Sequence, residues 1–291
     1  MREKIQGETN QTDNRTAPQA NSTLIDFASN IEQIRGHLEQ AVSNKELGNI
    51  TLAKAHTLHP IDEIYSSIEV QIDASNPTLN QSLSSSLNQL SNSVDNATIE
   101  EFKTKASDVN GLLNETSEKV IHSQEANSTI FNLMLVADLL SVGENEYREA
   151  VENGTVTEIV EYQDGQTFIS RAQSTFNQTA PMVPQEESAE VEEINGFFSD
   201  LENAVQSKAD VEVVSNSSRA IKHEISEVTG ISEQELSAAA VTGDNDPVTI
   251  ISEIRNLLNQ TLNAYENQDY SEAETLAIQA YLDNYEFIEA P

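Results

Sequence analysis

The sequence predicts an all-α protein, in which repeated antiparallel helical hairpins form helix bundles. Apolar residues recur at spacings of three and four along much of the chain, as they do on one face of an α-helix. Alternating strand patterns are nearly absent, and only 10 glycines and 7 prolines are present among 291 residues. A hydrophobic content of 37% is enough to build a core for such helices.

Five apolar stripes define the clearest helices. The first covers about twenty residues and contains Leu24, Phe27, Ile31, Ile34, Leu38 and Ala41. The others are Leu79, Leu83, Leu87, Leu90 and Val94; then Ile99, Phe102, Ala106 and Val109; then Ile130, Leu133, Ala137, Leu140 and Tyr147; and Val191, Ile194, Phe198, Leu201 and Val205.

Composition divides the chain into four parts. Residues 1–20 have almost no apolar side chains and are predicted to form a flexible leader. Residues 177–188 contain two prolines and are predicted to link an N-terminal helical bundle domain, 21–176, to a C-terminal helical bundle domain, 189–291.

An internal repeat supports the hairpin prediction. Residues 31–69 align without a gap with residues 251–289, with ten identities over thirty-nine positions. Each copy is predicted to be a long helix, a turn near residues 46–50 or 267–271, and a second helix. In this alignment His37 and His56 fall opposite leucines, which predicts that both histidines face a core.

Charge limits the classes of partner. The chain carries 49 acidic against 15 basic side chains, a formal net charge of −34. This argues against nucleic acid and anionic lipid as partners and favours cations. No apolar window reaches the roughly 18 residues of a membrane span, and the first ten residues lack the apolar core of a signal peptide. We expect that any signal or anchor is absent from this sequence.

Asparagine-x-serine/threonine sequons are more frequent than the about five expected by chance. They begin at Asn10, Asn14, Asn21, Asn49, Asn80, Asn96, Asn114, Asn127, Asn153, Asn177, Asn216 and Asn259. A composition rich in Asn, Ser and Thr explains part of this excess, and N-linked glycosylation in the cell envelope or outside the cell explains the rest. Strong acidity, many sequons and the absence of cysteine are together typical of an archaeal cell-surface protein.

The strongest candidate for chemistry is the stretch AKAHTLHPIDEIY, residues 53–65. His56 and His59 share one face of a helix, and Glu63 continues that face one turn later. Imidazoles and a carboxylate at this spacing can bind a transition metal, which predicts an iron or copper site at these residues with His37 as a further ligand.

The alternative is a packed corner with hydrogen-bonded histidines. Pro60 disfavours helical geometry at His59 and is well placed as the first residue of a new helix, so two helices are expected to meet at a bend. Asp62 and Glu63 would then complement the dipole of the new helix without any metal.

Two other stretches carry weaker signals. His122 and Glu125, three residues apart in an otherwise helical run, form a second candidate metal pair. The stretch EYQDGQTF, residues 161–168, either lines a bundle interior or is interrupted by Gly165. No nucleophile elbow, phosphate loop, zinc-protease motif or haem motif is present, so the protein is not expected to be an enzyme.

The C-terminal run AYENQDYSEAETLAIQAYLDNYEFIEAP, residues 264–291, resembles a segment of the extracytoplasmic helical domains associated with high-affinity iron permeases. The stretches GNITLAKAHTLHPIDEIY and EYQDGQTFISRAQSTF look like further elements of archaeal surface proteins of that kind. The resemblance implies a domain that captures or hands over iron or copper near a membrane permease. The permease signature R-E-x-x-E is absent, so transport itself is not implied. The motif G-x-H-x-x-E of the related imelysin-type iron proteins is also absent, so the metal site of those proteins is not implied.

Two hypotheses of different classes follow. The first is an extracellular, glycosylated helical module that binds a metal ion, iron or copper, and works with a permease or other envelope proteins. The second is a structural envelope protein that self-assembles as a homo-oligomer into a filament, layer or sheath, and it predicts exposed apolar stripes left over for neighbouring copies.

Overall fold

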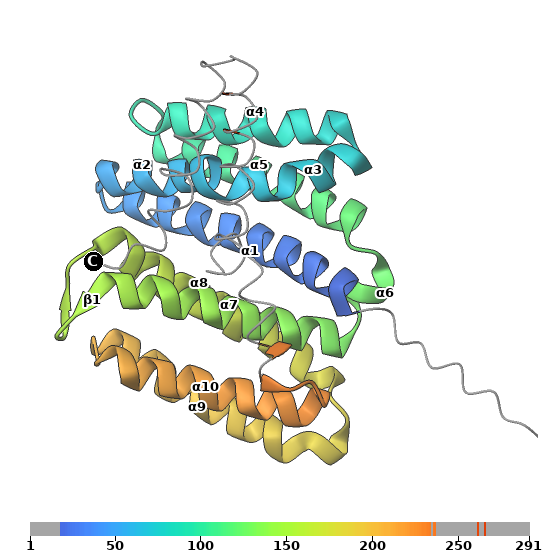
Figure 1. Cartoon of the computed structure of the whole chain (residues 1–291). Coiled ribbons are helices and arrows are strands. Elements are labelled where there is room, and N and C mark those ends of the chain that lie inside the picture. The colour runs from blue at the N-terminus through green and yellow to red at the C-terminus, as the bar shows by residue number, and fades with distance from the viewer. Residues whose placement is uncertain (1–17, 234, 237–260, 262–264, 266–291) are drawn as a thin grey trace, which may run out of the picture.

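Helices make up nearly all of the described chain, which confirms the all-α prediction. The computed structural model describes residues 18–233, 235, 236, 261 and 265 (Figure 1). Its α-helices are α1 (Pro18–Glu46), α2 (Ile50–His59), α3 (Tyr65–Ser75), α4 (Pro77–Ser93), α5 (Ile99–Val120), α6 (Ser123–Ala126), α7 (Thr129–Ala150), α8 (Ile159–Thr179), α9 (Ser188–Gln206) and α10 (Val211–Thr229). A two-stranded antiparallel hairpin, β1 (Val151–Glu152) and β2 (Thr155–Val156), joins α7 to α8.

The helices are stacked in layers with α1 in the middle. Figure 1 shows α2 to α5 on one side of α1, the pair α7 and α8 on the other side, and α9 and α10 beyond that pair. One hydrophobic cluster joins most of α1 to α2, α3, α4 and α5, and a second joins the beginning of α1 to α7, α8, α9 and α10. Helix α1 therefore contributes to both cores.

The division of the core differs from the predicted domain division. The second cluster continues from α8 to α9 across residues 177–188, where the rings of Phe176 and Phe198 lie 5.7 Å apart. The predicted linker begins inside α8 and continues as two 3-10 turns, Ala180–Met182 and Gln185–Glu187. The two clusters instead adjoin at Ile121, which packs against both.

The predicted stripes form most of the core. Phe27, Leu83, Phe102 and Phe198, one from each of four stripes, are all buried. Leu24, Ile99 and Val191 are half-buried, and Ile130 is 48% exposed in the first turn of α7. The boundary of the leader was also wrong, because residues 18–20 already belong to α1.

The first predicted hairpin is confirmed, and the predicted bend is not. Helices α1 and α2 are joined by a tight turn in which Gly48 has the left-handed backbone that glycine tolerates best (φ 78°). His59 remains helical, and a π-helical turn, Pro60–Ile64, leads directly into α3. The wider π turn accommodates the proline ring without ending the helix. The second copy of the repeat, 251–289, lies outside the described residues except for 261 and 265.

Candidate metal centre

Three histidines and one aspartate converge where α1, α2 and α8 meet. The Nδ1 atoms of His37 and His56 lie 3.0 and 3.2 Å from the same oxygen, Asp164 Oδ1. The Nδ1 atom of His59 lies 3.5 Å from the second oxygen, Asp164 Oδ2. Ligand atoms of His37, His59 and Asp164 all lie within 4.8 Å of one another, which is the spacing of a set that can hold one ion.

The centre of this cluster is closed to solvent, yet its polar atoms are unsatisfied. His37, His56 and Asp164 are 3%, 0% and 1% exposed. Both carboxylate oxygens of Asp164 and the Nδ1 atoms of the two buried histidines lack hydrogen bonds of acceptable geometry, although they lie close together. Buried polar atoms are normally paired, so four unpaired atoms facing one another form a group that could hold a cation.

The tautomer of His56 is fixed by a chain of amides. Asn44 Nδ2 donates to the carbonyl of Gln40, which can only accept, and this fixes the orientation of the Asn44 amide. Asn44 and Gln163 then exchange two hydrogen bonds, of 2.9 and 3.3 Å, which places Gln163 Oε1 opposite His56 Nε2 at 2.8 Å. Because an amide oxygen only accepts, His56 Nε2 carries a proton, and Nδ1, which faces Asp164, is the nitrogen that is left to bind a metal ion.

Glycines beside the ligands allow the helices to approach closely. A side chain at Gly36, next to His37, would meet Phe168 and Thr167 of α8 at 3.0 Å. A side chain at Gly165, next to Asp164, would meet the carbonyl oxygen of Gly143 on α7 at 3.0 Å. Gly165 therefore does not interrupt α8; it sets the packing distance that brings Asp164 to the histidines.

The electrostatics of the cluster are those of a centre that holds positive charge. Burial alone would raise the pKa of the Asp164 carboxyl, but the three imidazoles around it hold that pKa well below its usual range. The interaction with Asp164 raises the pKa of His59 to about 9, whereas burial lowers the pKa of His37. The aspartate thus remains ionised where water is excluded.

Further carboxylates surround the histidine cluster. His59 Nε2 lies 3.8 Å from Glu63 Oε1, which joins the partly exposed histidine to a carboxylate at the surface. Burial, together with the charges of Asp164 and Glu161, raises the pKa of Glu146 on α7 to about 8. The site is therefore approached through negative potential, which favours the entry of cations.

The structure brings together some of the predicted ligands and separates others. His37, His56 and His59 are adjacent, and Glu63 lies at the edge of the cluster. His122 is exposed at the N-cap of the four-residue helix α6, not inside a longer helix, and neither it nor Glu125 joins a cluster of three or more metal-binding side chains among the described residues. Sequence reasoning missed Asp164 as a ligand, although it did identify residues 161–168 as a stretch that could line a bundle interior.

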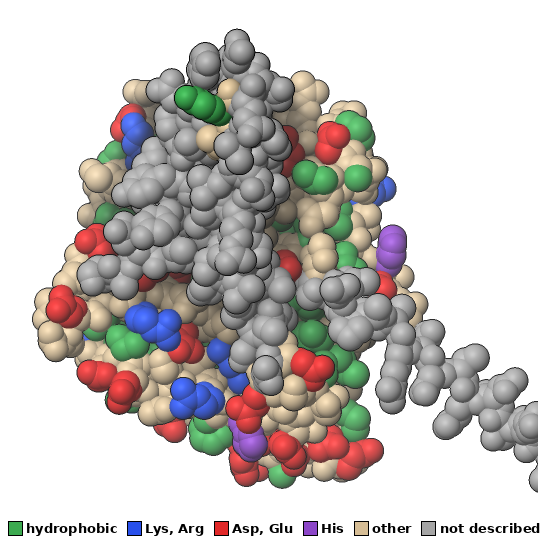
Figure 2. Space-filling view, in the orientation of Figure 1, with side chains coloured by type: hydrophobic (Ala, Val, Ile, Leu, Met, Phe, Trp, Pro, Cys, Tyr) green, Lys and Arg blue, Asp and Glu red, His purple; other side chains and the backbone are tan. Residues whose placement is uncertain are grey.

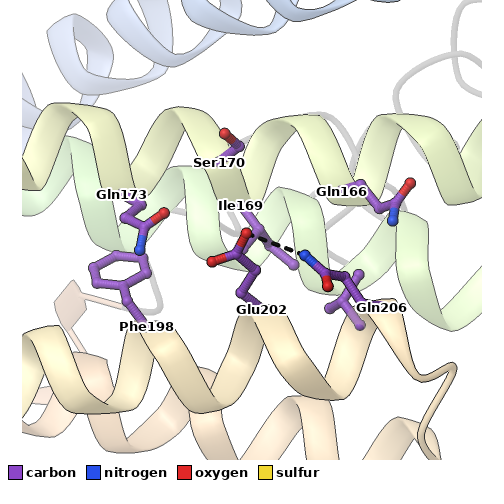
Figure 3. A pocket seen from close by; sticks show the side chains of 8 residues that line it. Gln166, Ile169, Ser170, Gln173, Phe198, Glu202 and Gln206 are labelled. Carbon is purple, nitrogen blue, oxygen red and sulfur yellow. Dashed lines mark hydrogen bonds between the residues drawn. The ribbon is translucent and has the colours of Figure 1, made fainter.

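A second hollow lies between α8 and α9 and offers little chemistry. It holds about 100 Å³ and is lined by Gln166, Ile169, Ser170, Gln173, Phe198, Glu202, Val205 and Gln206. Figure 3 shows its one lining carboxylate, Glu202, hydrogen-bonded to Gln206 (3.1 Å). The lining contains no histidine and no cluster of charges, so the candidate site remains at Asp164.

Comparison with known proteins gives one match. Residues 122–232 match the family model of the iron permease-associated 4-helix bundle domain, a segment that contains α6 to α10 and Asp164 but none of the three histidines of the cluster. Neither the curated proteins nor the solved structures give a match. The match confirms the predicted resemblance for residues 122–232, whereas the C-terminal run that suggested it lies outside the matched segment.

Proposed function

Because residues 122–232 form an iron permease-associated 4-helix bundle domain, we propose that the protein is a metal-binding accessory module of an iron-permease-like system. It binds one iron or copper ion as cargo between this domain and the helices α1 and α2. We place the module outside the cytoplasm, in the cell envelope, with N-linked glycans and a membrane permease as partner.

The observation that carries the proposal is the buried contact between His56 and Asp164. His56 Nδ1 lies 3.2 Å from Asp164 Oδ1, neither atom has a hydrogen bond of acceptable geometry, and the other ring nitrogen of His56 is held by Gln163. Buried polar atoms that lie this close without a hydrogen bond are well placed to share a cation. Three imidazoles and one carboxylate are suitable ligands for iron, copper and zinc.

The arrangement of the ligands suits an ion that must be picked up and released. His37 and His56 are sealed inside, whereas the side chain of His59 is 19% exposed and lies between Asp164 and Glu63. An ion can therefore reach the buried carboxylate past a single side chain. None of the described helices is long and apolar enough to cross a membrane.

The surface gives the structural hypothesis less support. The large exposed hydrophobic residues among the described ones come from different elements and do not form a stripe; examples are Leu47, Val70 and Val213. In Figure 2 acidic side chains are spread over the lower part of the visible face, where α9 and α10 lie. Such a surface favours contact with cations over contact with further copies of the same chain.

The direct test is a titration of the metal-free protein with Cu²⁺, Zn²⁺ and, without oxygen, Fe²⁺, followed by calorimetry. We expect one ion per chain, and we expect the double variant His56→Ala/His59→Ala to lose this binding. The matched control is His122→Ala/Glu125→Ala, which removes the other predicted pair and should bind as the unmodified protein does. Equal binding by both double variants would refute the site.

The affinity order alone does not identify the cargo, because most nitrogen and oxygen sites bind Cu²⁺ more tightly than Fe²⁺ or Zn²⁺. Elemental analysis of the protein isolated from its native envelope without chelators identifies the ion. We expect a near-integral content of iron or copper, and a metal-free protein would contradict the proposal.

A further inference from the structure

The sequon asparagines differ sharply in their surroundings. We propose that N-linked glycans are attached at three turns at one end of the helix stack, at Asn49, Asn153 and Asn96, and that Asn80 carries none. This inference rests on the extracytoplasmic location proposed above. An acceptor must present a free side-chain amide and enter the active site of another protein, which an exposed turn permits and a packed helix does not.

Asn49 lies in the turn between α1 and α2. It is exposed, and Thr51, the hydroxyl residue of its sequon, is also exposed. Asn49 occupies the N-cap position of α2, where asparagine usually bonds the first helical N–H groups, yet its side chain makes no capping hydrogen bond. Its amide is therefore free to react.

Asn153 lies at the tip of the hairpin between β1 and β2. The φ angles of Asn153 and Gly154 are 50° and 72°, both in the left-handed region. A tight two-residue hairpin turn requires such angles, and Asn-Gly is the pair that it prefers. Asn153 and Thr155 are both exposed, and the Asn153 side chain has no hydrogen bond with another described residue. The turn holds the amide away from the rest of the protein.

Asn96 lies in the turn between α4 and α5 and is also exposed. The hydroxyl residue of its sequon, Thr98, caps α5 and exchanges hydrogen bonds with Glu101. Recognition of this sequon must disturb the cap. We therefore expect lower occupancy at Asn96 than at Asn49 and Asn153.

Three other sequon asparagines, Asn80, Asn114 and Asn216, are held in packed or hydrogen-bonded positions. Asn80 is only 8% exposed inside α4, and its side chain accepts from the Tyr65 hydroxyl. A glycan added there before folding would prevent this packing, so the folded protein should lack it. Asn114 and Asn216 lie within helices and accept hydrogen bonds from Arg35 and Arg219.

Asn127 and Asn177 complete the comparison. The Asn127 side-chain amide donates to the carbonyl of Ser123. This hydrogen bond occupies the amide nitrogen that would carry the glycan. Asn177 is exposed but lies in the last turns of α8, where its backbone is held in the helix.

The three proposed acceptors share one end of the stack. Lys45, just before the α1–α2 turn, donates to the carbonyl of Val94 in the α4–α5 turn. Asn44 pairs with Gln163 in the first turns of α8, which follow the hairpin. Figure 1 shows these three turns together at the left. Glycans there would cover this end and leave the remaining faces for a protein partner.

The test is glycopeptide mass spectrometry on the protein isolated from its native cell envelope, with sequon variants expressed in the same host. We expect glycans at Asn49 and Asn153, partial occupancy at Asn96, and an unmodified Asn80. Thr51→Val and Thr155→Val should each remove the mass of one glycan from the intact protein. The controls Thr51→Ser and Thr155→Ser keep the sequons and should keep both glycans.

The outcomes separate this inference from the proposed function. Glycans at Asn80, or on the helical sequons while the three turns are bare, would overturn the assignment and leave the envelope location standing. A protein with no glycan at any sequon would overturn both the assignment and the glycosylated part of the proposed function, while metal binding is measured separately.

Discussion

Two aspartates are buried among the residues that the structure describes, and they differ in what surrounds them. Asp164 on α8 is 1% exposed and faces three imidazoles, which keep its pKa well below the usual range. Asp138 on α7 is 4% exposed, and burial, opposed mainly by a hydrogen bond from Ser29, raises its pKa to about 7. Burial favours the neutral carboxyl in both cases, so it is the histidines that make Asp164 a permanent anion and therefore a suitable ligand.

Exchange of each carboxylate for an amide gives the largest contrast. Asp164→Asn removes both the charge and a ligand oxygen, and we expect metal affinity to fall by a factor of about 100 or more, since even the loss of an outer hydrogen-bond partner costs 10- to 100-fold. Asp138→Asn makes the same chemical change away from the site and should leave affinity unchanged. Calorimetric titration of both variants checks this, and similar losses in both would remove the distinction between the two aspartates.

The position of Asp164 depends on how closely α7 and α8 approach. In Gly165→Ala the new methyl group would lie 3.0 Å from two backbone atoms, the Gly143 oxygen and the Tyr147 nitrogen, and neither can move without shifting α7. We expect a loss of about 3 kcal/mol in the free energy of unfolding, together with weaker metal binding. Urea denaturation measures the first effect, and calorimetry measures the second.

The control for this substitution is Gly196→Ala on α9. Its methyl group would meet no atom within 4 Å. It should therefore stabilise the protein by up to about 1 kcal/mol through the higher helix propensity of alanine. If both glycine variants were equally stable, close approach of α7 and α8 would not be what positions Asp164.

The next largest effect is expected from the amides of Asn44 and Gln163, which hold the ring of His56. Gln163→Leu removes the acceptor that fixes the His56 tautomer, and we expect metal affinity to fall by about 10- to 100-fold. Gln163→Glu keeps an acceptor oxygen and should restore much of the affinity. Gln173→Leu, on the same helix but outside the site, is the control.

The tautomer of His56 shows whether Gln163 acts through its hydrogen bond or through packing. Nitrogen NMR of the metal-free protein reports which ring nitrogen of His56 carries the proton, and in Gln163→Leu we expect a mixture of tautomers. An unchanged tautomer together with lower affinity would mean that Gln163 acts through packing alone.

The sequence was informative where the signal is local. The α1 stripe, the α1–α2 hairpin and the His56–His59 pair all follow from spacings of a few residues. The alignment of His37 and His56 with leucines correctly predicted that both are buried. The bend expected at Pro60 was wrong, because a π turn absorbs the proline.

The rest depends on contacts between distant parts of the chain. Asp164 is more than one hundred residues from each of the three histidines, and only the packing of α8 on α1 and α2 brings it to them. Gly36, which permits this packing, and Gly165, which permits the close approach of α7 and α8, have no side chain that a pattern could reveal. The division of the core near Ile121 also lacks a sequence signal, since the prolines of 177–188 lie beside a core that continues past them.

The smallest effect concerns the pH dependence of stability in the metal-free protein. The pKa of Asp138 is about 7 in the folded state, above the usual value of about 3.9 that holds in the unfolded chain. The folded state therefore binds more protons between these values, so the free energy of unfolding falls as the pH rises from about 4 to about 7. Asp138→Asn cannot ionise and lacks this slope, so its stability relative to that of the unmodified protein should rise over this pH range.

The neighbouring cation does not reverse this expectation. Lys222 is the positive charge that lowers the pKa of Asp138. Its Nζ atom lies 3.7 Å from Glu144 Oε2, so Lys222 keeps this partner when Asp138 becomes an amide. Urea denaturation with a chelator at pH 4.5, 6 and 8 measures the difference between the two proteins. A difference that stays constant over this range would mean that Asp138 is ionised throughout, as Asp164 is, and that burial without histidines is enough to hold a charge here.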